Sequence, residues 1–390
     1  MANGQQHYGI IVEIAKDNND LRYMITEKGI PIQDACLWLD LISVNSYLTG
    51  ERYAYALMRY FRFLRKNGLV HREVTSKRVI EEYIKDLLGL GEKIIDFESQ
   101  ITFTALNTYI TVLKSFYHWL EDEYKVTTNP VLFSSKRTKR SSLVSTKLLY
   151  GQIWQFDIDE TIMARVTYRR KRNHLKWYSK EEITNILQEL PTLRDKVVFS
   201  ISVETGMRIG EILGIKLDHF NSFEPSIEVV RQHNIENRAQ AKTTERTLQI
   251  YQPLAESIQT YISTERAESD VLESNFLFLN IRGSFKGTPL KARNFLRILK
   301  DAGERAGLTR TEMRTHSGRS TRAQELVELM REKPELGITK TFIDEELGWR
   351  SERSIKSYEK GYSMGQKRKI MERIRPVVLK NQGGDKLDED

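Results

Sequence analysis

Hydrophobic residues recur along this chain with two different spacings. The first spacing, a period of two, is found within residues 1–33. Apolar and polar positions alternate over 8–15 and again over 21–26, and the stretch Asp17-Asn18-Asn19-Asp20 separates the two runs. Alternation with a period of two is typical of β-strands, and Asn and Asp favour turns. We therefore expect an N-terminal β-hairpin, which either contacts a binding partner or only packs against the next domain.

Residues 34–130 change to the helical spacing, in which apolar residues recur every three or four positions. The predicted helix over 51–66 has an apolar face made of Tyr53, Leu57, Phe61 and Leu64. Its opposite face is basic and carries Arg52, Arg59, Arg62 and Lys66. A second amphipathic helix is expected over 103–120, with one face made of Phe103, Leu106, Ile110, Leu113, Phe116 and Leu120.

Helix start and stop signals complete the description of this domain. Asp34 is placed to cap a first helix, and Thr75-Ser76 is placed to open a third. Asn129-Pro130 ends the domain, because a residue that precedes proline disfavours the helical conformation. The sequence thus predicts a domain of four helices over 34–130.

Residues 131–173 lack a clear period and are strongly basic. The stretch 130–177 holds eleven basic and three acidic residues, so its net charge of +8 equals that of the whole chain. The clustered cations are Lys136, Arg137, Lys139, Arg140, Arg169, Arg170, Lys171 and Arg172. This connection is either a solvated linker or a strap that lies along a polyanion.

A second domain is expected over 174–380, followed by a polar, acidic tail over 381–390. Ser179 with Glu182 predicts a capping box at the start of a helix. Two strand-like runs follow at 227–231 and 247–251, and the pattern after Pro253 is mainly helical to about residue 378. The predicted fold class is therefore mainly α with a small β-sheet, an α+β chain.

Composition restricts the partners and the compartment. No window approaches 18 consecutive apolar residues, so we expect no membrane span. The single cysteine, Cys36, permits neither a disulfide within the chain nor a Cys-x-x-Cys zinc site, which suits a cytoplasmic protein. A net charge of +8 with 29% charged residues indicates an anionic partner, most commonly nucleic acid. Arg59, Arg62, Lys66 and the eight linker cations are candidate contacts.

Six residues in the second domain together suit one chemistry, the transfer of a phosphodiester to a tyrosine. They are Arg208, Lys242, His316, Arg319, Trp349 and Tyr358. The phenol has an ordinary pKa near 10, so a tyrosine nucleophile needs cationic neighbours. Arginine binds phosphate through its planar fork and stays charged. Each of these residues alone has an ordinary explanation as a surface or core residue; the set suggests a site.

The expected roles follow from residue chemistry. Arg208 and Arg319 would hold the phosphate oxygens, with Glu211 three residues after Arg208 to orient its guanidinium. Lys242, in the turn between the two strands, would protonate the leaving oxygen. Its rival, Arg246, cannot give up its proton.

His316 and Trp349 are expected to assist at the same site. His316 is three residues before Arg319, so both face one point and His316 serves as a proton shuttle or hydrogen-bond donor. Trp349 can donate only through its indole nitrogen. Tyr362, one helical turn after Tyr358, competes with it as nucleophile.

These residues together resemble the tyrosine recombinase, or phage integrase, family over roughly 175–375. Thr205-Gly206-Met207-Arg208-Ile209-Gly210-Glu211 is similar to the first arginine box, and Ala241-Lys242-Thr243 to the lysine turn. His316-Ser317-Gly318-Arg319 is similar to the His-x-x-Arg box. Leu347-Gly348-Trp349 precedes Tyr358 at the family's nine-residue spacing, which favours Tyr358 over Tyr362.

Three departures from the family pattern stand out. Trp349 occupies a position that is histidine in many members, and Gly318 occupies one that is usually leucine. The interval between Arg319 and Trp349 is longer than usual, as is the interdomain connection. These departures affect the subfamily and the partner contacts.

The resemblance implies a core-binding domain over 34–130 and a catalytic domain over 174–380. It implies an enzyme that cleaves and rejoins DNA through a 3′-phosphotyrosyl intermediate, in integration, excision or transposition of mobile DNA. It further implies double-stranded DNA with specific recombination sites as partner, neither metal nor cofactor, a homotetramer on DNA, accessory DNA-bending or directionality proteins, and a place at the bacterial nucleoid. The alternatives are a type IB topoisomerase and a DNA-binding protein without catalytic activity.

Overall fold

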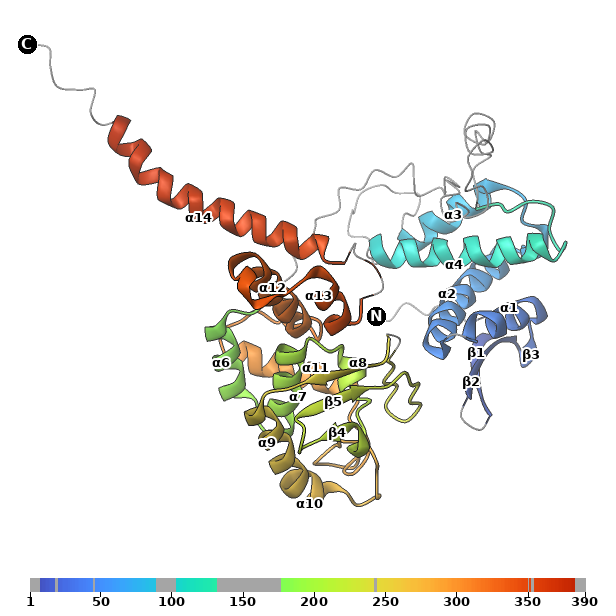
Figure 1. Ribbon diagram of the computed structural model, residues 1–390. Coiled ribbons are helices and arrows are strands. Elements are labelled where there is room, and N and C mark those ends of the chain that lie inside the picture. Colours follow the sequence, from blue (N-terminus) through green and yellow to red (C-terminus); the bar gives the residue numbers. More distant parts are fainter. Residues whose placement is uncertain are drawn as a thin grey trace, which may run out of the picture. The chain divides into compact units, whose positions relative to one another are not determined.

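The computed structural model describes residues 8–17, 20–44, 46–88, 103–131, 177–241, 244–349, 351 and 354–382. The chain forms two compact units, residues 1–171 and 172–390 (Figure 1). The basic connection expected over 131–173 falls almost entirely outside the described residues, and so does the acidic tail after Gln382. Among the described residues, no helix combines the length and apolar character needed to cross a lipid bilayer.

The N-terminal unit begins with a three-stranded antiparallel sheet of β1 (Ile10–Asp17), β2 (Asp20–Glu27) and β3 (Ile30–Pro31). β1 pairs with β2 in the register that joins Ile10 to Glu27. Ile10, Tyr23 and Ile25 are buried in the same hydrophobic cluster as the helices that follow. The hairpin therefore packs against the helical domain, and whether it also contacts a binding partner stays a prediction.

Four helices make up the rest of this unit: α1 (Gln33–Ser43), α2 (Tyr47–Lys66), α3 (Lys77–Leu88) and α4 (Phe103–Asp122). A short 3-10 turn, η1 (His71–Glu73), lies between α2 and α3. Leu57, Phe61 and Leu64 are buried, as the helical period predicted. The hydroxyls of Tyr60 and Tyr117 meet at 2.7 Å inside this core, which satisfies two buried polar groups at once.

Asp34 is not the helix cap that the sequence suggested. The cap position of α1 is Ile32, and Asp34 lies in the first turn with 2% of its surface exposed. Its carboxylate accepts from Arg72 Nε at 2.6 Å, pairs with Lys125 Nζ at 3.1 Å, and lies 2.8 Å from His71 Nε2. Burial alone raises the pKa of this carboxyl, but the bonds from Arg72, His71 and Lys125 outweigh burial and lower it. Asp34 therefore joins η1 and the end of α4 to α1.

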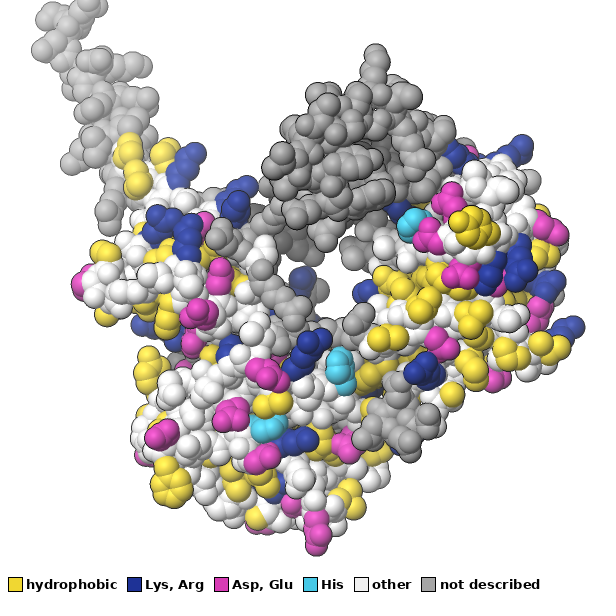
Figure 2. Space-filling model, turned by 45° about the vertical axis from the view of Figure 1, so that its right-hand side comes forward, with side chains coloured by type: hydrophobic (Ala, Val, Ile, Leu, Met, Phe, Trp, Pro, Cys, Tyr) yellow, Lys and Arg dark blue, Asp and Glu magenta, His cyan; other side chains and the backbone are white. Residues whose placement is uncertain are grey.

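Hydrophobic side chains also gather on the outside of this unit (Figure 2). α1 exposes Leu37, Leu41 and Val44, spaced four and three residues apart and hence on one helical face. The sequence pattern for this first helix therefore contains an apolar stripe in addition to the stripe that packs on the core.

The C-terminal unit opens with α6 (Lys180–Glu189), whose predicted capping box is present: Ser179 Oγ accepts from the Glu182 N–H, and the Glu182 carboxylate accepts from the Ser179 N–H. α7 (Leu193–Thr205), α8 (Ile209–Ile212) and the 3-10 turn η4 (Leu217–His219) follow. An antiparallel sheet then forms from β4 (Phe220–Asn221), β5 (Ser226–Val229) and β6 (Arg246–Gln249). The strands predicted at 227–231 and 247–251 correspond to β5 and β6, while β4 was not predicted.

The helices after the sheet are α9 (Gln252–Tyr261), the π-helical turn η5 (Ile262–Arg266), α10 (Ala267–Ser269) and α11 (Ala292–Arg305). The chain after Pro253 is mainly helical, as predicted, and residues 276–290 interrupt the helices. Leu277 donates to the Ile215 carbonyl at 2.9 Å, and Leu290 donates to the Phe278 carbonyl at 2.9 Å. Phe276 to Leu279 are all buried, so this continuous apolar run forms an extended, covered segment.

The chain ends in α12 (Ser317–Glu332), the 3-10 turn η6 (Pro334–Leu336), α13 (Lys340–Leu347) and the long α14 (Lys356–Gln382). α12, α13 and the start of α14 share a separate hydrophobic cluster that includes Ile343, Leu347 and Tyr358. The structure is mostly helical with small antiparallel sheets, which confirms the predicted fold class.

Candidate active site

Arg208 lies at the junction between α7 and α8. α7 ends at Thr205, and Gly206 adopts the left-handed conformation with φ of 66°, where glycine is favoured. Arg208 then occupies the cap position of α8, as the sequence predicted. Its Nη1 donates to Glu211 Oε1 at 3.1 Å, so the expected pair three residues apart is present. The Arg208 side chain remains 36% exposed, while that of Glu211 is fully buried.

Arg319 lies inside the unit, on the first turns of α12, with 1% of its surface exposed. Its Nη1 donates to the Gly206 carbonyl at 2.8 Å, and its Nη2 donates to the Leu347 carbonyl. Burial, and to a lesser degree the nearby Arg208 charge, lower the pKa of this guanidinium to about 9, so it remains protonated at neutral pH. Arg319 thus joins the Arg208 box to the end of α13.

His316 is the residue directly before α12 and is exposed. Desolvation of the ring, then the charges of Arg319 and Arg208, lower the pKa of its imidazole below the ordinary value. His316 is therefore neutral at pH 7, a form that can both accept and donate a proton.

Tyr358 is the third residue of α14 and is 4% exposed. Its hydroxyl lies 3.5 Å from Ser320 Oγ, on the residue next to Arg319. Its ring stacks on Trp349, with centroids 5.5 Å apart and planes inclined by 20°. The Arg319 guanidinium carbon lies 5.6 Å from the centroid of the same Trp349 ring, so the indole lies close to both the tyrosine and the arginine.

Tyr362, the competing nucleophile, is partly buried against the cluster formed by α12, α13 and the start of α14. Tyr358 has the polar neighbour on α12, whereas Tyr362 contributes mainly apolar packing. The choice of Tyr358, which the nine-residue spacing favours, stays a prediction.

Lys242 lies outside the described residues, in the connection between β5 and β6. On one side of it, Ala241 is buried and donates to the Gln232 carbonyl at 3.1 Å. On the other side, β6 begins at Arg246. The alternative cation, Arg246, donates through Nη2 to Glu211 Oε2 at 3.0 Å, so it belongs to the Arg208 pair and has a structural partner already.

The three predicted DNA contacts on α2 all interact within the N-terminal unit. Arg62 donates through Nε and Nη2 to the Ile10 carbonyl, at 3.0 and 2.7 Å. The Arg59 guanidinium lies 5.5 Å from the Tyr109 ring centroid, and Lys66 lies 3.5 Å from Asp86. The basic face predicted for this helix is therefore partly used by the hairpin and by α3 and α4. The other eight predicted contacts, from Lys136 to Arg172, lie outside the described residues.

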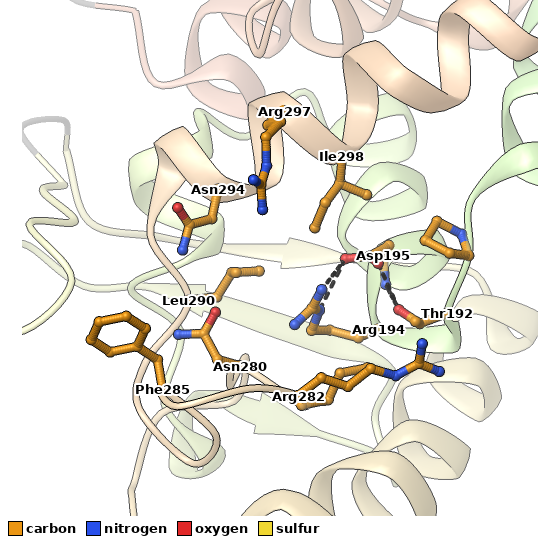
Figure 3. A pocket seen from close by; sticks show the side chains of 12 residues that line it. Thr192, Arg194, Asp195, Asn280, Arg282, Phe285, Leu290, Asn294, Arg297 and Ile298 are labelled. Carbon is orange, nitrogen blue, oxygen red and sulfur yellow. Dashed lines mark hydrogen bonds and ion pairs between the residues drawn. The ribbon is translucent and has the colours of Figure 1, made fainter.

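A basic surface that the sequence analysis missed surrounds a cavity of about 300 Å³ (Figure 3). Arg297 and Asn294 approach the cavity from α11, and Arg282 and Phe285 approach it from the loop before that helix. At its floor, Arg194 donates to Asp195 Oδ1 at 2.7 Å, and both residues are buried.

Two exposed cations at this cavity, Arg282 and Arg297, and the exposed Arg293 one turn before Arg297 differ from the cations at and after the far end of α11. Arg282, Arg293 and Arg297 form no ion pair with an acidic residue of the described part of the chain. By contrast, Arg305 pairs with Glu189 at 3.0 Å and Arg310 with Asp301 at 2.7 Å. The signal in the sequence is the basic run from Lys291 to Lys300, in which Arg293 and Arg297 are one turn apart. We name Arg282, Arg293 and Arg297 the α11 basic patch.

Comparison with known proteins identifies the C-terminal unit. The model of the phage integrase family matches residues 176–363. Transposase A from transposon Tn554 of Staphylococcus aureus is 23% identical over 322 residues, which are 79% of this chain and 81% of that protein. Tyrosine recombinase XerC of Staphylococcus haemolyticus is 27% identical over 252 residues, covering 59% of this chain and 79% of that protein.

Solved structures match over both units. The Tn1549 transposon integrase in complex with transposon right end DNA is 16% identical, with a TM-score of 0.56, and the match covers 88% of this chain and 99% of that chain. The XerH site-specific recombinase bound to a palindromic difH substrate is 15% identical, with a TM-score of 0.54 over 84% of this chain and 79% of that chain. The fold is therefore shared with recombinases and integrases. The resemblance predicted from the sequence is confirmed: residues 176–363 match the phage integrase family, and the chain is a tyrosine recombinase, an enzyme that breaks and rejoins DNA strands.

Proposed function

We propose that this protein recombines mobile DNA at specific sites, with Tyr358 as the nucleophile. The observation that carries this proposal is the convergence of three separate chain segments. Arg208 from α8, Arg319 from α12 and Tyr358 from α14 are joined through Glu211, the Gly206 and Leu347 carbonyls, and the Trp349 ring. This arrangement places fixed positive charge beside a phenol, as attack on a phosphodiester requires.

In the proposed reaction, the Tyr358 oxygen bonds to the scissile phosphorus and the bond to the 5′ oxygen breaks. Arg208 and Arg319 hold the non-bridging oxygens, whose charge must be stabilised in the transition state. Lys242 gives a proton to the leaving 5′ oxygen, and neutral His316 accepts the phenolic proton. A 5′ hydroxyl of a second strand reverses the step. The phosphotyrosyl bond conserves the energy of the phosphodiester, so the reaction needs no ATP.

We further propose that the α11 basic patch and the basic connection over 131–173 contact the DNA backbone. Unpaired arginines on a surface favour a polyanion, because neutralising phosphates releases counterions. Arg305 and Arg310, at and after the other end of α11, already pair with acidic residues, so we expect them to contribute less to DNA binding. The two proposed surfaces are independent of the catalytic residues, so binding and cleavage can be separated by mutation.

The match to Tn554 transposase favours transposition or integration of a mobile element in a bacterial cytoplasm. We propose a homotetramer on two duplexes. α14 exposes Ile370, Met371 and Ile374 far beyond Tyr358, and apolar residues on an extended helix favour docking on a neighbouring protomer. Accessory DNA-bending or directionality proteins are further partners that we propose for the same reaction.

The nucleophile is tested with a nicked duplex that carries an end of the mobile element and traps the covalent product. Tyr358→Phe should bind this DNA and form no adduct, because the nucleophilic oxygen is absent. Tyr362→Phe is the matched control, since it removes the same atom one helical turn away, and it should still form the adduct. An adduct that survives in Tyr358→Phe and disappears in Tyr362→Phe would reverse the assignment.

Two further outcomes distinguish the alternatives. Relaxation of supercoiled plasmid without a preferred site would favour a topoisomerase. Specific binding without any adduct from the unaltered chain would favour a DNA-binding protein that lacks catalytic activity. Adduct formation restricted to the element ends supports the recombinase.

A further inference from the structure

Arg246, the first residue of β6, is held by two other elements of the catalytic unit, α8 and α13. Its side chain is only 9% exposed. Nη2 donates to Glu211 Oε2 on α8 at 3.0 Å, and Nε donates to the Glu346 carbonyl near the end of α13 at 3.0 Å. This one guanidinium therefore joins the sheet to the Arg208 box and to the helix that leads to Trp349.

Gly348 shows how closely Arg246 fits the turn after α13. Gly348 has φ of 57°, and a Cβ atom built there would lie 2.8 Å from Nη1 and 3.0 Å from Cζ of Arg246. The guanidinium therefore packs against the backbone of the residue that precedes Trp349. Since Trp349 stacks on Tyr358, the position of Arg246 bears on the position of the nucleophile.

Arg246 also determines which oxygens of the Glu211 carboxylate are available to Arg208. Glu211 Oε2 accepts from the Arg208 backbone N–H at 3.1 Å and from Arg246, while Oε1 accepts from Arg208 Nη1. Because Arg246 occupies Oε2, Arg208 bonds to the carboxylate through one guanidinium nitrogen. The rest of the Arg208 fork stays available, in agreement with its partial exposure.

We propose that Arg246 is a positioning residue that prevents Arg208 from closing onto Glu211 as a two-bond pair. Without Arg246, the free Oε2 would attract a second Arg208 nitrogen and withdraw the guanidinium from the phosphate. Arg246 itself does not touch the DNA. This role rests on the proposed function, and it adds a residue to which that function assigns no part.

This role predicts a difference between a charged and an uncharged substrate in addition to a loss of rate. If Arg246 acts by keeping Arg208 free to neutralise a charged phosphate oxygen, its loss should matter less when that oxygen is uncharged. A methylphosphonate at the scissile position replaces one charged oxygen by a neutral methyl group. Arg246→Gln should slow adduct formation on the phosphodiester by on the order of 10²-fold, as expected for a displaced catalytic group. On the methylphosphonate, the rate of adduct formation by Arg246→Gln should stay within a few-fold of the rate of the unaltered chain.

The matched control is Arg266→Gln. The Arg266 side chain is 6% exposed, pairs with Asp270 at 3.0 Å and donates to the Phe276 carbonyl, so its loss tests the effect of removing a structural arginine from this unit. Arg266→Gln should lower thermal stability without a difference between the two substrates. Arg246→Lys is measured in parallel. Lysine keeps the charge but lacks the planar fork that bonds the Glu211 carboxylate and the Glu346 carbonyl in fixed directions, so it should show the same substrate difference to a smaller degree. The lysine variant provides the test if the glutamine variant does not fold.

Equal losses on both substrates, or cleavage by the Arg246 variants at the normal rate, would overturn the positioning role. The unaltered chain is the reference in every assay. If it forms no adduct on the phosphodiester, the proposed function fails, and the role of Arg246 fails with it. If it forms the adduct and only the substrate difference is missing, the recombinase stands and the role of Arg246 is excluded.

Discussion

At the scale of residues, the charge of the site is set by one buried carboxylate among three arginines. Glu211 bonds to Arg208 and to Arg246. Burial lowers the pKa of the third arginine, Arg319, and the charges of Arg208 and Arg246 lower it further, while the charge of Glu211 raises it. A buried charge is tolerated when it is paired and hydrogen-bonded. These three arginines thus outnumber the carboxylate that they share, and in the proposed function the phosphate of the DNA would balance the remaining positive charge.

The neutral state of His316 leads to a prediction about pH. Burial, Arg319 and Arg208 lower the pKa of the imidazole, so the ring of the free protein should titrate below the usual value of about 6.5. Arg208→Gln should raise the titration midpoint, because it removes one of the two cations. NMR of labelled histidine, assigned with His316→Gln, measures both.

The sign of the linked stability change follows from the same shift. The unfolded chain binds this proton more tightly than the folded chain, so His316 favours unfolding as pH falls below about 6.5. A midpoint at or above 6.5 in the free protein would contradict the electrostatic description of the site.

At the scale of elements, the placement of Arg319 depends on the contact between α12 and α7. A Cβ atom at Gly318 would lie 2.1 Å from Ser202 Oγ and 3.0 Å from the Ser202 carbonyl carbon. The two helices therefore approach more closely than any side chain at position 318 allows. This contact gives a physical reason for glycine where the family usually has leucine, since a leucine would push apart the helices that carry Gly206 and Arg319.

Gly318→Ala should lower the free energy of unfolding by about 1–3 kcal/mol, the typical cost of overpacking a core. It should also reduce adduct formation, because Arg319 is the next residue. Adding Ser202→Gly should recover part of the lost stability. Urea unfolding of the full chain measures the free energies.

Gly365→Ala is the matched control for this helix substitution. Gly365 is also helical but has no heavy atom within 4 Å of a built Cβ. Alanine there should be neutral or slightly stabilising. Equal costs at positions 318 and 365 would mean that helix propensity, not the α7–α12 contact, explains the loss.

At the scale of the whole molecule, positive charge is divided between the catalytic centre, the α11 basic patch and the connection over 131–173. The double variant Arg293→Ala, Arg297→Ala should weaken DNA binding at every sequence. It should also reduce the salt slope by about one for each DNA phosphate that the two arginines neutralise. Filter binding between low and moderate salt measures the slope.

The paired arginines supply the control for this prediction. Arg305→Ala with Arg310→Ala removes the same formal charge, but each of these arginines already has an acidic partner. Its salt slope should change little. Equal slopes in the two double variants would show that the α11 basic patch does not bind DNA and that only net charge matters.

Local patterns in the sequence predicted part of this molecule. The period of α2, the capping box of α6 and the pairing of Arg208 with Glu211 depend on residues three or four positions apart. Such relations can be read from the chain itself.

Contacts between distant residues could not be predicted in this way. The bond from Arg246 to Glu346 joins positions 100 residues apart, and that from Arg62 to Ile10 joins positions 52 apart. The pattern showed Arg62 on a polar face, but only the fold shows that a strand covers that face. The α11 basic patch was missed because its unpaired state depends on where the acidic side chains lie in the fold.

The packing of the N-terminal hairpin has a practical consequence for any experiment on residues 1–33. Tyr23 and Ile25 contribute to the same core as Trp38, and Arg62 bonds to the Ile10 carbonyl. A chain shortened to begin at residue 34 would expose this core to water, so reduced DNA binding would report unfolding of the unit. Surface substitutions at exposed positions such as Ile14 and Lys16 keep the core intact and ask directly whether the hairpin touches DNA.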